Sequence, residues 1–151
     1  MRSIVFAFAL VGCASPTTGE YLFEEVSTTT DCPEVEDTGG EPAENEPVAV
    51  KVSDEGDSVS IGGFDCPLDG NTFTCEYEPT VVDYSTFGTD LVAVATFTAG
   101  STGTWVSSSK ISGTSESSST CEGADCATTE SDYGAVYCTT TTEYEGLLQD
   151  E

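Results

Sequence analysis

From residue 48 onward, apolar and polar side chains alternate in short runs, as they do in β-strands that bury one face. In residues 48–52, three valines share one face and Lys51 lies on the other, and residues 71–78 alternate in the same way. Gly-, Asp- and Ser-rich turns separate the runs, and no run has the periodicity of a helix. The pattern therefore predicts an all-β chain without helices.

The runs predict about eight strands in an antiparallel meander, because short turns join most neighbouring runs. Two architectures fit, a small β-sandwich and an up-and-down, lipocalin-like barrel. Residues 20–30 are expected to form the first strand, with Tyr21 and Phe23 on one face. Later strands are expected in residues 80–87, 90–99, 103–113, 114–121 and 135–146.

Some runs depart from simple alternation. The run 58–66 changes phase by one position at Gly62–Gly63, which predicts a β-bulge. Residues 90–99 are apolar on both faces, which predicts a central strand covered on both sides. The Ser/Thr-rich runs 115–120 and 139–144 are assigned to outward, solvated strand faces.

The predicted core is thin for roughly 100 ordered residues. Disulfides at about 2–4 kcal/mol each are therefore expected to supply much of the stability. The core is expected to draw on Val50, Ile61, Phe64, Phe73, Tyr77, Leu91, Val94, Phe97, Trp105, Ile111 and Val136.

One disulfide follows from a hairpin. A turn centred between Gly70 and Asn71 sets Cys66 opposite Cys75. A two-residue turn and a four-residue loop both keep this register, and the loop moves Pro67 to a position that needs no N–H. The cysteine pair 66–75 is expected in either case.

The remaining cysteines of the domain are Cys32, Cys121, Cys126 and Cys138, which allow three pairings. Cys121 and Cys126 lie in the tight segment CEGADC, so their pairing is preferred, with Cys32 left for Cys138. A metal site at CEGADC is not expected, because the chain has no histidine and six cysteines suit an oxidising compartment.

Charge and composition exclude several functions. The chain has 28 acidic and three basic residues, a net charge of −25, no histidine, and no arginine after Arg2. This charge repels nucleic acid, and the missing histidine removes Ser–His–Asp and Cys–His catalysis. The acidic turns at residues 54–57 and 65–71 lack the EF-hand spacing for calcium. We expect no nucleic-acid binding, no metal, no cofactor and no enzymatic activity.

The N-terminus has the anatomy of an export signal. Arg2 precedes the apolar residues 4–11, which are too few to span a bilayer as a helix. The run ends in Leu-Val-Gly-Cys, which resembles the lipobox of bacterial lipoproteins. The resemblance implies cleavage before Cys13 and acyl chains on its thiol, and Ala14 after it resembles outer-membrane sorting.

These expectations divide the chain into a signal peptide at 1–12, an anchor and spacer at 13–19, and one β domain at 20–151. An acidic Pro/Glu-rich loop is expected at about 31–47. The leading functional hypothesis is a lipid-anchored, non-catalytic surface module of a bacterial envelope. Its expected partners are the membrane, through the acyl chains on Cys13, and a cationic protein or envelope polymer. The alternative is a carrier of a small apolar ligand inside a lipocalin-like barrel.

The Cys13 hypothesis makes a direct prediction. Intact mass spectrometry of detergent-extracted protein from its own cells should show a chain that begins at Cys13 and carries acyl chains. The six other cysteines should lack six hydrogens. A Cys13→Ser variant should leave the membrane fraction, because the acyl attachment atom is lost. An unlipidated mass that begins elsewhere would contradict the anchor.

Overall fold

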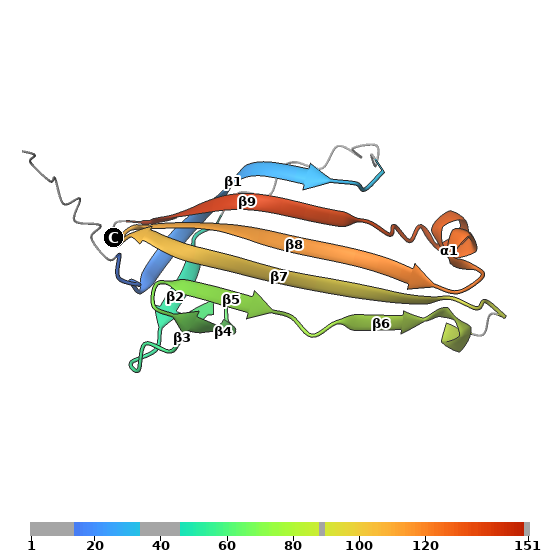
Figure 1. Ribbon diagram of the computed structural model, residues 1–151, viewed down its shortest axis with the longest axis horizontal. Helices are drawn as coiled ribbons and strands as arrows, with labels where there is room; N and C mark the ends of the chain where they lie inside the picture. The colour runs from blue at the N-terminus through green and yellow to red at the C-terminus, as the bar shows by residue number, and fades with distance from the viewer. Residues whose placement is uncertain (1–13, 34–45, 88–89, 150–151) are drawn as a thin grey trace, which may run out of the picture.

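The computed structural model describes residues 14–33, 46–87 and 90–149. In these ranges the chain forms nine strands and two short helices (Figure 1). The strands are β1 (Gly19–Thr30), β2 (Val48–Val52), β3 (Ser58–Ile61), β4 (Phe64–Asp69), β5 (Thr72–Glu76), β6 (Thr80–Asp83), β7 (Val94–Ser107), β8 (Lys110–Glu122) and β9 (Thr139–Leu148). The helices are the 3-10 helix η1 (Tyr84–Phe87) and the α-helix α1 (Cys126–Tyr133).

Eight of the strands close into an antiparallel barrel. The sheet order is β5-β4-β3-β2-β1-β9-β8-β7, and β7 returns to pair with β5. Apart from the β5–β7 and β1–β9 pairings, every pairing in the barrel joins two strands that are consecutive along the chain. The topology is therefore a meander. The all-β meander is confirmed, and of the two expected architectures the barrel is the one that forms.

The longest strands run past the closed barrel as a curved sheet (Figure 1). Here β6 takes the place of β5 beside β7, with Thr80 opposite Phe97 and Asp83 opposite Val94. We call this part the extension. It consists of residues 28–30, 80–83, 94–99, 117–122 and 139–142.

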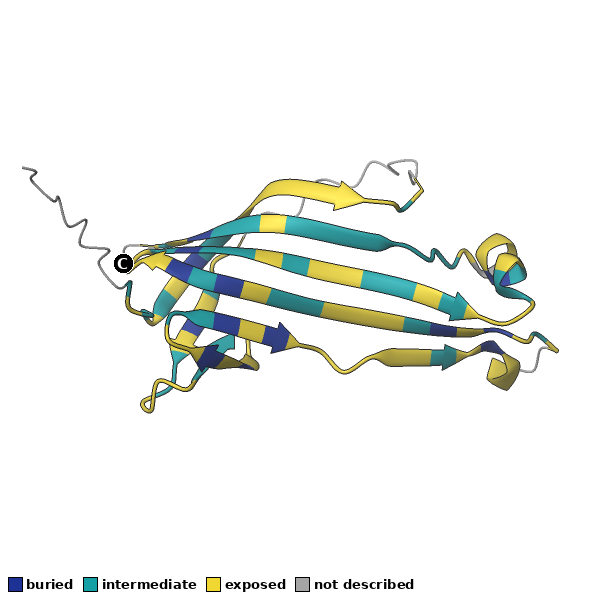
Figure 2. Cartoon of the chain, viewed as in Figure 1, coloured by how far each residue is buried: buried dark blue, intermediate teal, exposed yellow. Residues whose placement is uncertain are grey.

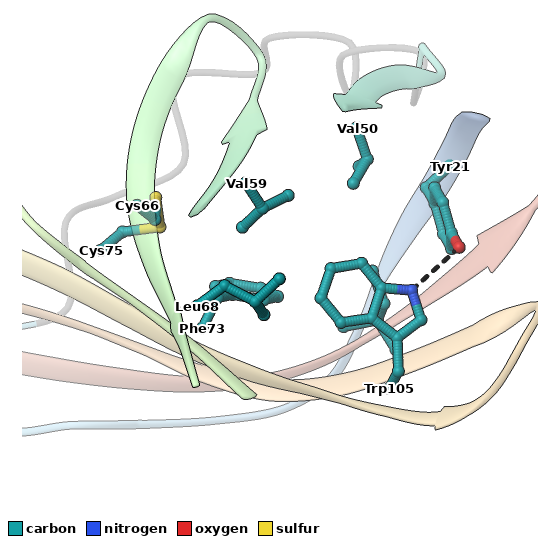
Figure 3. Packing of buried hydrophobic residues seen from close by; sticks show 9 residues of the cluster. Tyr21, Val50, Val59, Cys66, Leu68, Phe73, Cys75 and Trp105 are labelled. Atoms are coloured by element: carbon teal, nitrogen blue, oxygen red, sulfur yellow. Dashed lines mark hydrogen bonds between the residues drawn. A yellow bond between two sulfur atoms is a disulfide. The ribbon is translucent and has the colours of Figure 1, made fainter. Parts of the chain in front are cut away.

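The main core fills one end of the barrel (Figure 2). Trp105 and Tyr21 are both fully buried, and the Trp105 Nε1–H donates to the Tyr21 hydroxyl at 3.0 Å (Figure 3). The Tyr21 hydroxyl donates in turn to the Thr17 carbonyl at 3.1 Å. Phe73 packs edge-on against Trp105, with 5.6 Å between the ring centroids. This end of the barrel is therefore plugged, and its buried polar atoms are paired.

Three inward-facing glycines make room for the aromatic rings. A Cβ at Gly103 would collide with the ring of Phe73, and a Cβ at Gly146 with that of Phe23. Gly113 accommodates Tyr144 in the same way. Rings laid over glycines are a known means of stabilising a sheet where a strand lacks a side chain. The glycines thus set how closely the rings approach the barrel wall.

A second, smaller core lies at the tip of the extension. Tyr84, Ala93 and Ala95 are buried there, packed against Leu91 and Tyr137 among others. Helix α1 covers this cluster, and its fully buried Thr129 hydroxyl lies 2.6 Å from the Tyr137 hydroxyl. The prediction of a chain without helices is wrong here, because α1 has no apolar stripe that a sequence pattern could reveal.

Several strand predictions are also wrong. Residues 84–87 form η1 and are not part of a strand, and the expected strand 103–113 contains the turn between β7 and β8. Gly62 and Gly63 form a two-residue turn between β3 and β4, with φ of 57° and 90°, and not a bulge. Two positive φ values at a hairpin turn strongly favour glycine. The run 90–99 is not covered on both sides, since Val92 is 64% exposed while Ala93 and Ala95 are buried.

The predicted core is corrected in a similar way. Phe64, Tyr77, Val94 and Phe97 are 57%, 40%, 37% and 37% exposed, and Ile61, Leu91 and Val136 are half-buried. Tyr21, Val59, Leu68 and the two alanines of the second core take their places. Phe64 does face Tyr77, as the hairpin register requires, with 5.2 Å between ring centroids.

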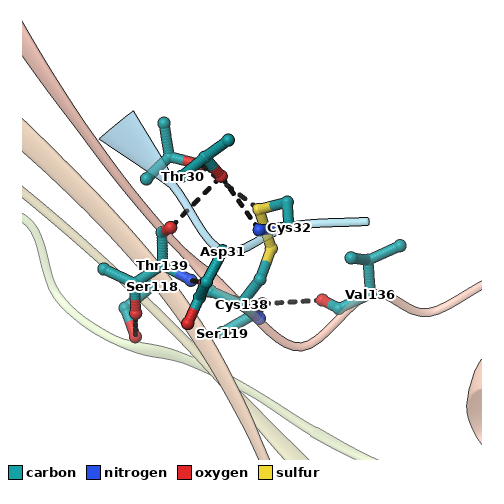
Figure 4. The surroundings of a disulfide bond; sticks show 9 residues. Thr30, Asp31, Cys32, Ser118, Ser119, Val136, Cys138 and Thr139 are labelled. Carbon is teal, nitrogen blue, oxygen red and sulfur yellow. Dashed lines mark hydrogen bonds between the residues drawn. A yellow bond between two sulfur atoms is a disulfide. The ribbon is translucent and has the colours of Figure 1, made fainter. Parts of the chain in front are cut away.

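Three disulfides join Cys66 to Cys75, Cys121 to Cys126, and Cys32 to Cys138, the pairs favoured from the sequence. The β4–β5 hairpin uses the two-residue turn Gly70–Asn71 and not the four-residue loop. The third disulfide ties the end of β1 to the residue before β9 (Figure 4).

The plug predicts a large effect of one substitution. Trp105→Ala should lower the free energy of unfolding by about 3–5 kcal/mol, because it empties the most tightly filled part of the core. Val106→Ala is the matched control; its side chain is 54% exposed, so the loss should stay below about 1 kcal/mol. Guanidinium unfolding followed by far-ultraviolet circular dichroism measures both losses. Tryptophan fluorescence is unsuitable, because Trp105 is the only tryptophan and its substitution removes the signal. Equal losses would show that Trp105 is not the plug.

Candidate functional site

A hollow of about 300 Å³ lies inside the barrel beside the plugged end. Its wall is mainly apolar and aromatic, with Phe23, Val48, Ile61, Phe73, Tyr77 and Tyr144 among the lining residues. These side chains come from both halves of the barrel, so the hollow depends on closure of the sheet. We call it the barrel hollow.

Small inward-facing side chains create the space. Ser101 pairs with Ser115 across β7 and β8, and Ser115 pairs with Thr142 across β8 and β9. These three residues form one row at the level of the hollow, and all three line it. Two positions nearer the plug on each strand, the corresponding row contains Gly103, Gly113 and Tyr144. The hollow therefore begins where the rings that lie over these glycines give way to serine and threonine side chains.

Tyr144 is the main polar group at the inner end of the hollow. Its hydroxyl lies 2.9 Å from the Ser101 Oγ and donates to the Thr102 carbonyl at 3.2 Å. Phe23 packs edge-on against its ring at 5.6 Å. Burial raises the pKa of the Tyr144 phenol above its ordinary value; the Ser101 hydrogen bond opposes this shift and nearby Tyr77 adds to it. Tyr144 is thus held as a neutral phenol.

The charges at the hollow are all negative. Glu24 and Glu25 line it, and no lysine or arginine does. In the described ranges, Lys51 lies on the outer face of β2, and Lys110 forms an ion pair with Glu145 at 2.8 Å. No base is therefore available in these parts of the chain to neutralise an acidic group bound in the hollow.

A second hollow of about 360 Å³ lies on the inner face of the extension. Tyr77 lines both hollows, so they meet at its ring. The second hollow is lined by Phe97, Glu78, several serines and threonines, and the Cys32–Cys138 disulfide. We call it the extension hollow.

Most hydroxyls of the extension hollow are already paired. Thr30 Oγ1 lies 2.8 Å from Thr140 Oγ1, and Ser119 Oγ donates to the Val136 carbonyl at 2.6 Å. Asp31 Oδ1 accepts the Thr139 N–H at 2.6 Å beside the disulfide (Figure 4). These polar groups stabilise the sheet end and offer few free donors to a ligand.

The sequence singled out Cys13, the six other cysteines and the acidic turns as candidate site residues. Cys13 lies outside the described residues. The other six cysteines are all in disulfides. Asp31 does approach the sulfurs of Cys32 and Cys138, but sulfurs joined to each other are not thiolate ligands. In the acidic turn after β2, Asp57 accepts a hydrogen bond from Ser53 at 2.9 Å, which stabilises the turn.

Sequence reasoning missed the residues that line the barrel hollow. Ser115, Thr140 and Thr142 belong to runs that the pattern assigns to outward faces, yet Ser115 and Thr142 line the barrel hollow and Thr140 lines the extension hollow. A signal was present, since Ser101 and Ser115 lie an even number of residues from Trp105 and Ile111 and so share their inward face.

Comparison with protein-family models, curated proteins and solved structures gave no match to this chain. No helix in the described part of the chain has the length and apolar character needed to cross a membrane. The fold and the two hollows therefore define the class, an up-and-down β-barrel with an apolar interior hollow.

The state of Tyr144 predicts a pH effect. The pKa of Tyr144 is higher in the folded state than in the unfolded chain, where tyrosines titrate at about pH 10. Stability from the neutral phenol is complete below about pH 10 and is lost as the pH rises through the folded pKa. Tyr144→Phe should therefore flatten the fall in unfolding free energy above about pH 10.

The check is urea unfolding across this range, together with tyrosinate absorbance of the folded protein. Ser101→Ala should move the Tyr144 titration to still higher pH, because the Ser101 hydrogen bond lowers this pKa. An unchanged high-pH absorbance titration in Tyr144→Phe would contradict the assignment.

Proposed function

We propose that the protein is a non-catalytic, extracytoplasmic binding protein that holds a small ligand with an apolar body in the barrel hollow. The observation that carries the proposal is the hollow of about 300 Å³ with an apolar and aromatic wall inside a closed barrel. Its volume lies at the lower end of the range typical of small-molecule sites. Of the two functions expected from the sequence, ligand carriage is the one that this geometry favours.

The construction of the hollow supports a binding role. The hollow opens to solvent, so its apolar wall stays in contact with water unless a ligand covers it. Replacing Ser101 and Ser115 by larger apolar residues would fill the space, as Trp105 and Ile111 fill the adjoining core. An apolar concavity that stays open to water beside a tightly filled core is typical of a ligand-binding groove.

The chemistry of the wall supports a non-catalytic role. The Ser101 hydroxyl, a candidate nucleophile, contacts a phenol whose raised pKa makes it neutral and a poor general base. The carboxylates that line the hollow are solvent-exposed, and none of them hydrogen-bonds Ser101 in the described structure. The site is suited to holding a molecule and not to changing it.

Three disulfides support an oxidising compartment, and we propose that Cys13 is the lipid attachment point on a bacterial envelope. Ala14 packs against the plugged core, and the Thr18 hydroxyl accepts the Val52 N–H at 3.0 Å. The segment after Cys13 is thus tied to the plugged end of the barrel. An anchor at Cys13 would place this end toward the membrane and the extension away from it.

Filling the hollow tests the binding function. The oxidised mature domain should bind the neutral dye N-phenyl-1-naphthylamine saturably, with a rise in fluorescence. Ser115→Phe places a ring in the hollow and should weaken dye binding by about tenfold or more, roughly 1.4 kcal/mol. Thr114→Phe is the matched control, because Thr114 is exposed on the outer face of the same strand.

Thr114→Phe should bind the dye as the unmodified protein does. Two results would overturn the function: no saturable dye binding by the folded protein, or equal weakening by Ser115→Phe and Thr114→Phe. Circular dichroism of each variant confirms that the barrel has formed before binding is compared.

A further inference from the structure

The two hollows share an excess of negative charge at their junction. Glu25 lines the barrel hollow and Glu78 lines the extension hollow, and both are solvent-exposed. Tyr77, which lines both hollows, lies between these two linings. Among the residues that the structure describes, no lysine or arginine lines either hollow. A positive group at this junction would be attracted from both sides, and a negative group repelled from both.

Two partly exposed aromatic rings line the extension hollow. Tyr77 is 40% exposed and Phe97 is 37% exposed, and both line the extension hollow. Phe64 packs edge-on against Tyr77 and supports its ring at 5.2 Å between centroids. The open face of an aromatic ring attracts cations, and quaternary ammonium groups are commonly bound in this way.

From the carboxylates and the exposed rings together we infer that the ligand is a cationic amphiphile, an apolar body that carries an amine or quaternary ammonium group. The inference rests on the proposed binding function. The apolar body lies in the barrel hollow, whose volume of about 300 Å³ suits a small ligand. The positive group lies at Tyr77, which lines the barrel hollow together with Glu25 and the extension hollow together with Glu78.

Other amphiphiles fit the site less well. A fatty acid would bring its carboxylate next to Glu24 and Glu25 with no base to pair it. A sugar headgroup needs many free hydrogen-bonding partners, and the Thr140 and Ser119 hydroxyls of the extension hollow are already bonded within the sheet. The carboxylates and the exposed rings favour a positive headgroup over a neutral one.

Three competitors, each with a chain of ten carbon atoms, test the inference. Decyltrimethylammonium and decanoate, kept below their micelle concentrations, and decanol, kept below its solubility limit, are titrated against bound N-phenyl-1-naphthylamine. We expect the ammonium compound to displace the dye at a concentration at least about tenfold lower than decanol does. Decanoate should be the weakest of the three, because its charge is repelled.

Paired variants separate the local charges from the strong net charge of the whole chain. Glu25→Gln with Glu78→Gln should reduce the advantage of the ammonium compound over decanol to about threefold or less. Asp54→Asn with Glu55→Gln makes the same change of net charge in the exposed turn after β2, away from both hollows, and should keep the full advantage. Equal losses in the two paired variants would overturn the inference.

The outcomes distinguish the two proposals. If none of the competitors displaces the dye, the binding function itself fails. If decanol or decanoate competes as well as the ammonium compound, the binding function stands and the cationic ligand is wrong. Tyr77→Leu, which keeps an apolar side chain at this position, should weaken displacement by the ammonium compound more than displacement by decanol.

Discussion

Five backbone pairs, from Thr72–Thr104 to Glu76–Gly100, join β5 to β7 and close the sheet on itself. Without this ladder the same strands would form an open, twisted sheet with its apolar face in water. Closure encloses the plugged core and leaves the barrel hollow beside it. The Cys66–Cys75 disulfide holds β4 and β5 together next to the closing ladder, so the covalent bond strengthens the edge on which closure depends.

The barrel is filled unevenly, and this unevenness positions the site. Trp105, Tyr21 and Phe73 fill one end, and the second core under α1 fills the tip of the extension. Between the two cores the inner face carries serine, threonine and alanine, and the exposed rings of Tyr77 and Phe97 stand at its edge. The two cores hold the ends of the long strands in place, so the middle need not be packed to remain folded.

Local signals in the sequence predict much of the fold. Alternation in residues 48–52 and 71–78 gives strands, and the Gly70–Asn71 turn gives the register that brings Cys66 to Cys75. The β5–β7 closure has no such signal, because it joins strands that are separated by β6 and η1. Ala93 and Ala95 are buried only because Tyr84 and α1 cover them, which is a tertiary contact. The hollow was missed for a related reason: Ser115 and Thr142 look like surface residues until the pairing places them inside.

The disulfide between Cys32 and Cys138 spans 106 positions and turns most of the domain into a covalent ring. A single cut of the backbone anywhere in this ring leaves one molecule, not two, because both new ends remain tied through the same bond. The pieces also stay paired side by side in the sheet, so loss of a peptide bond need not become loss of a strand. A protein built in this way can survive proteolytic nicking in an environment where peptide bonds are under constant attack.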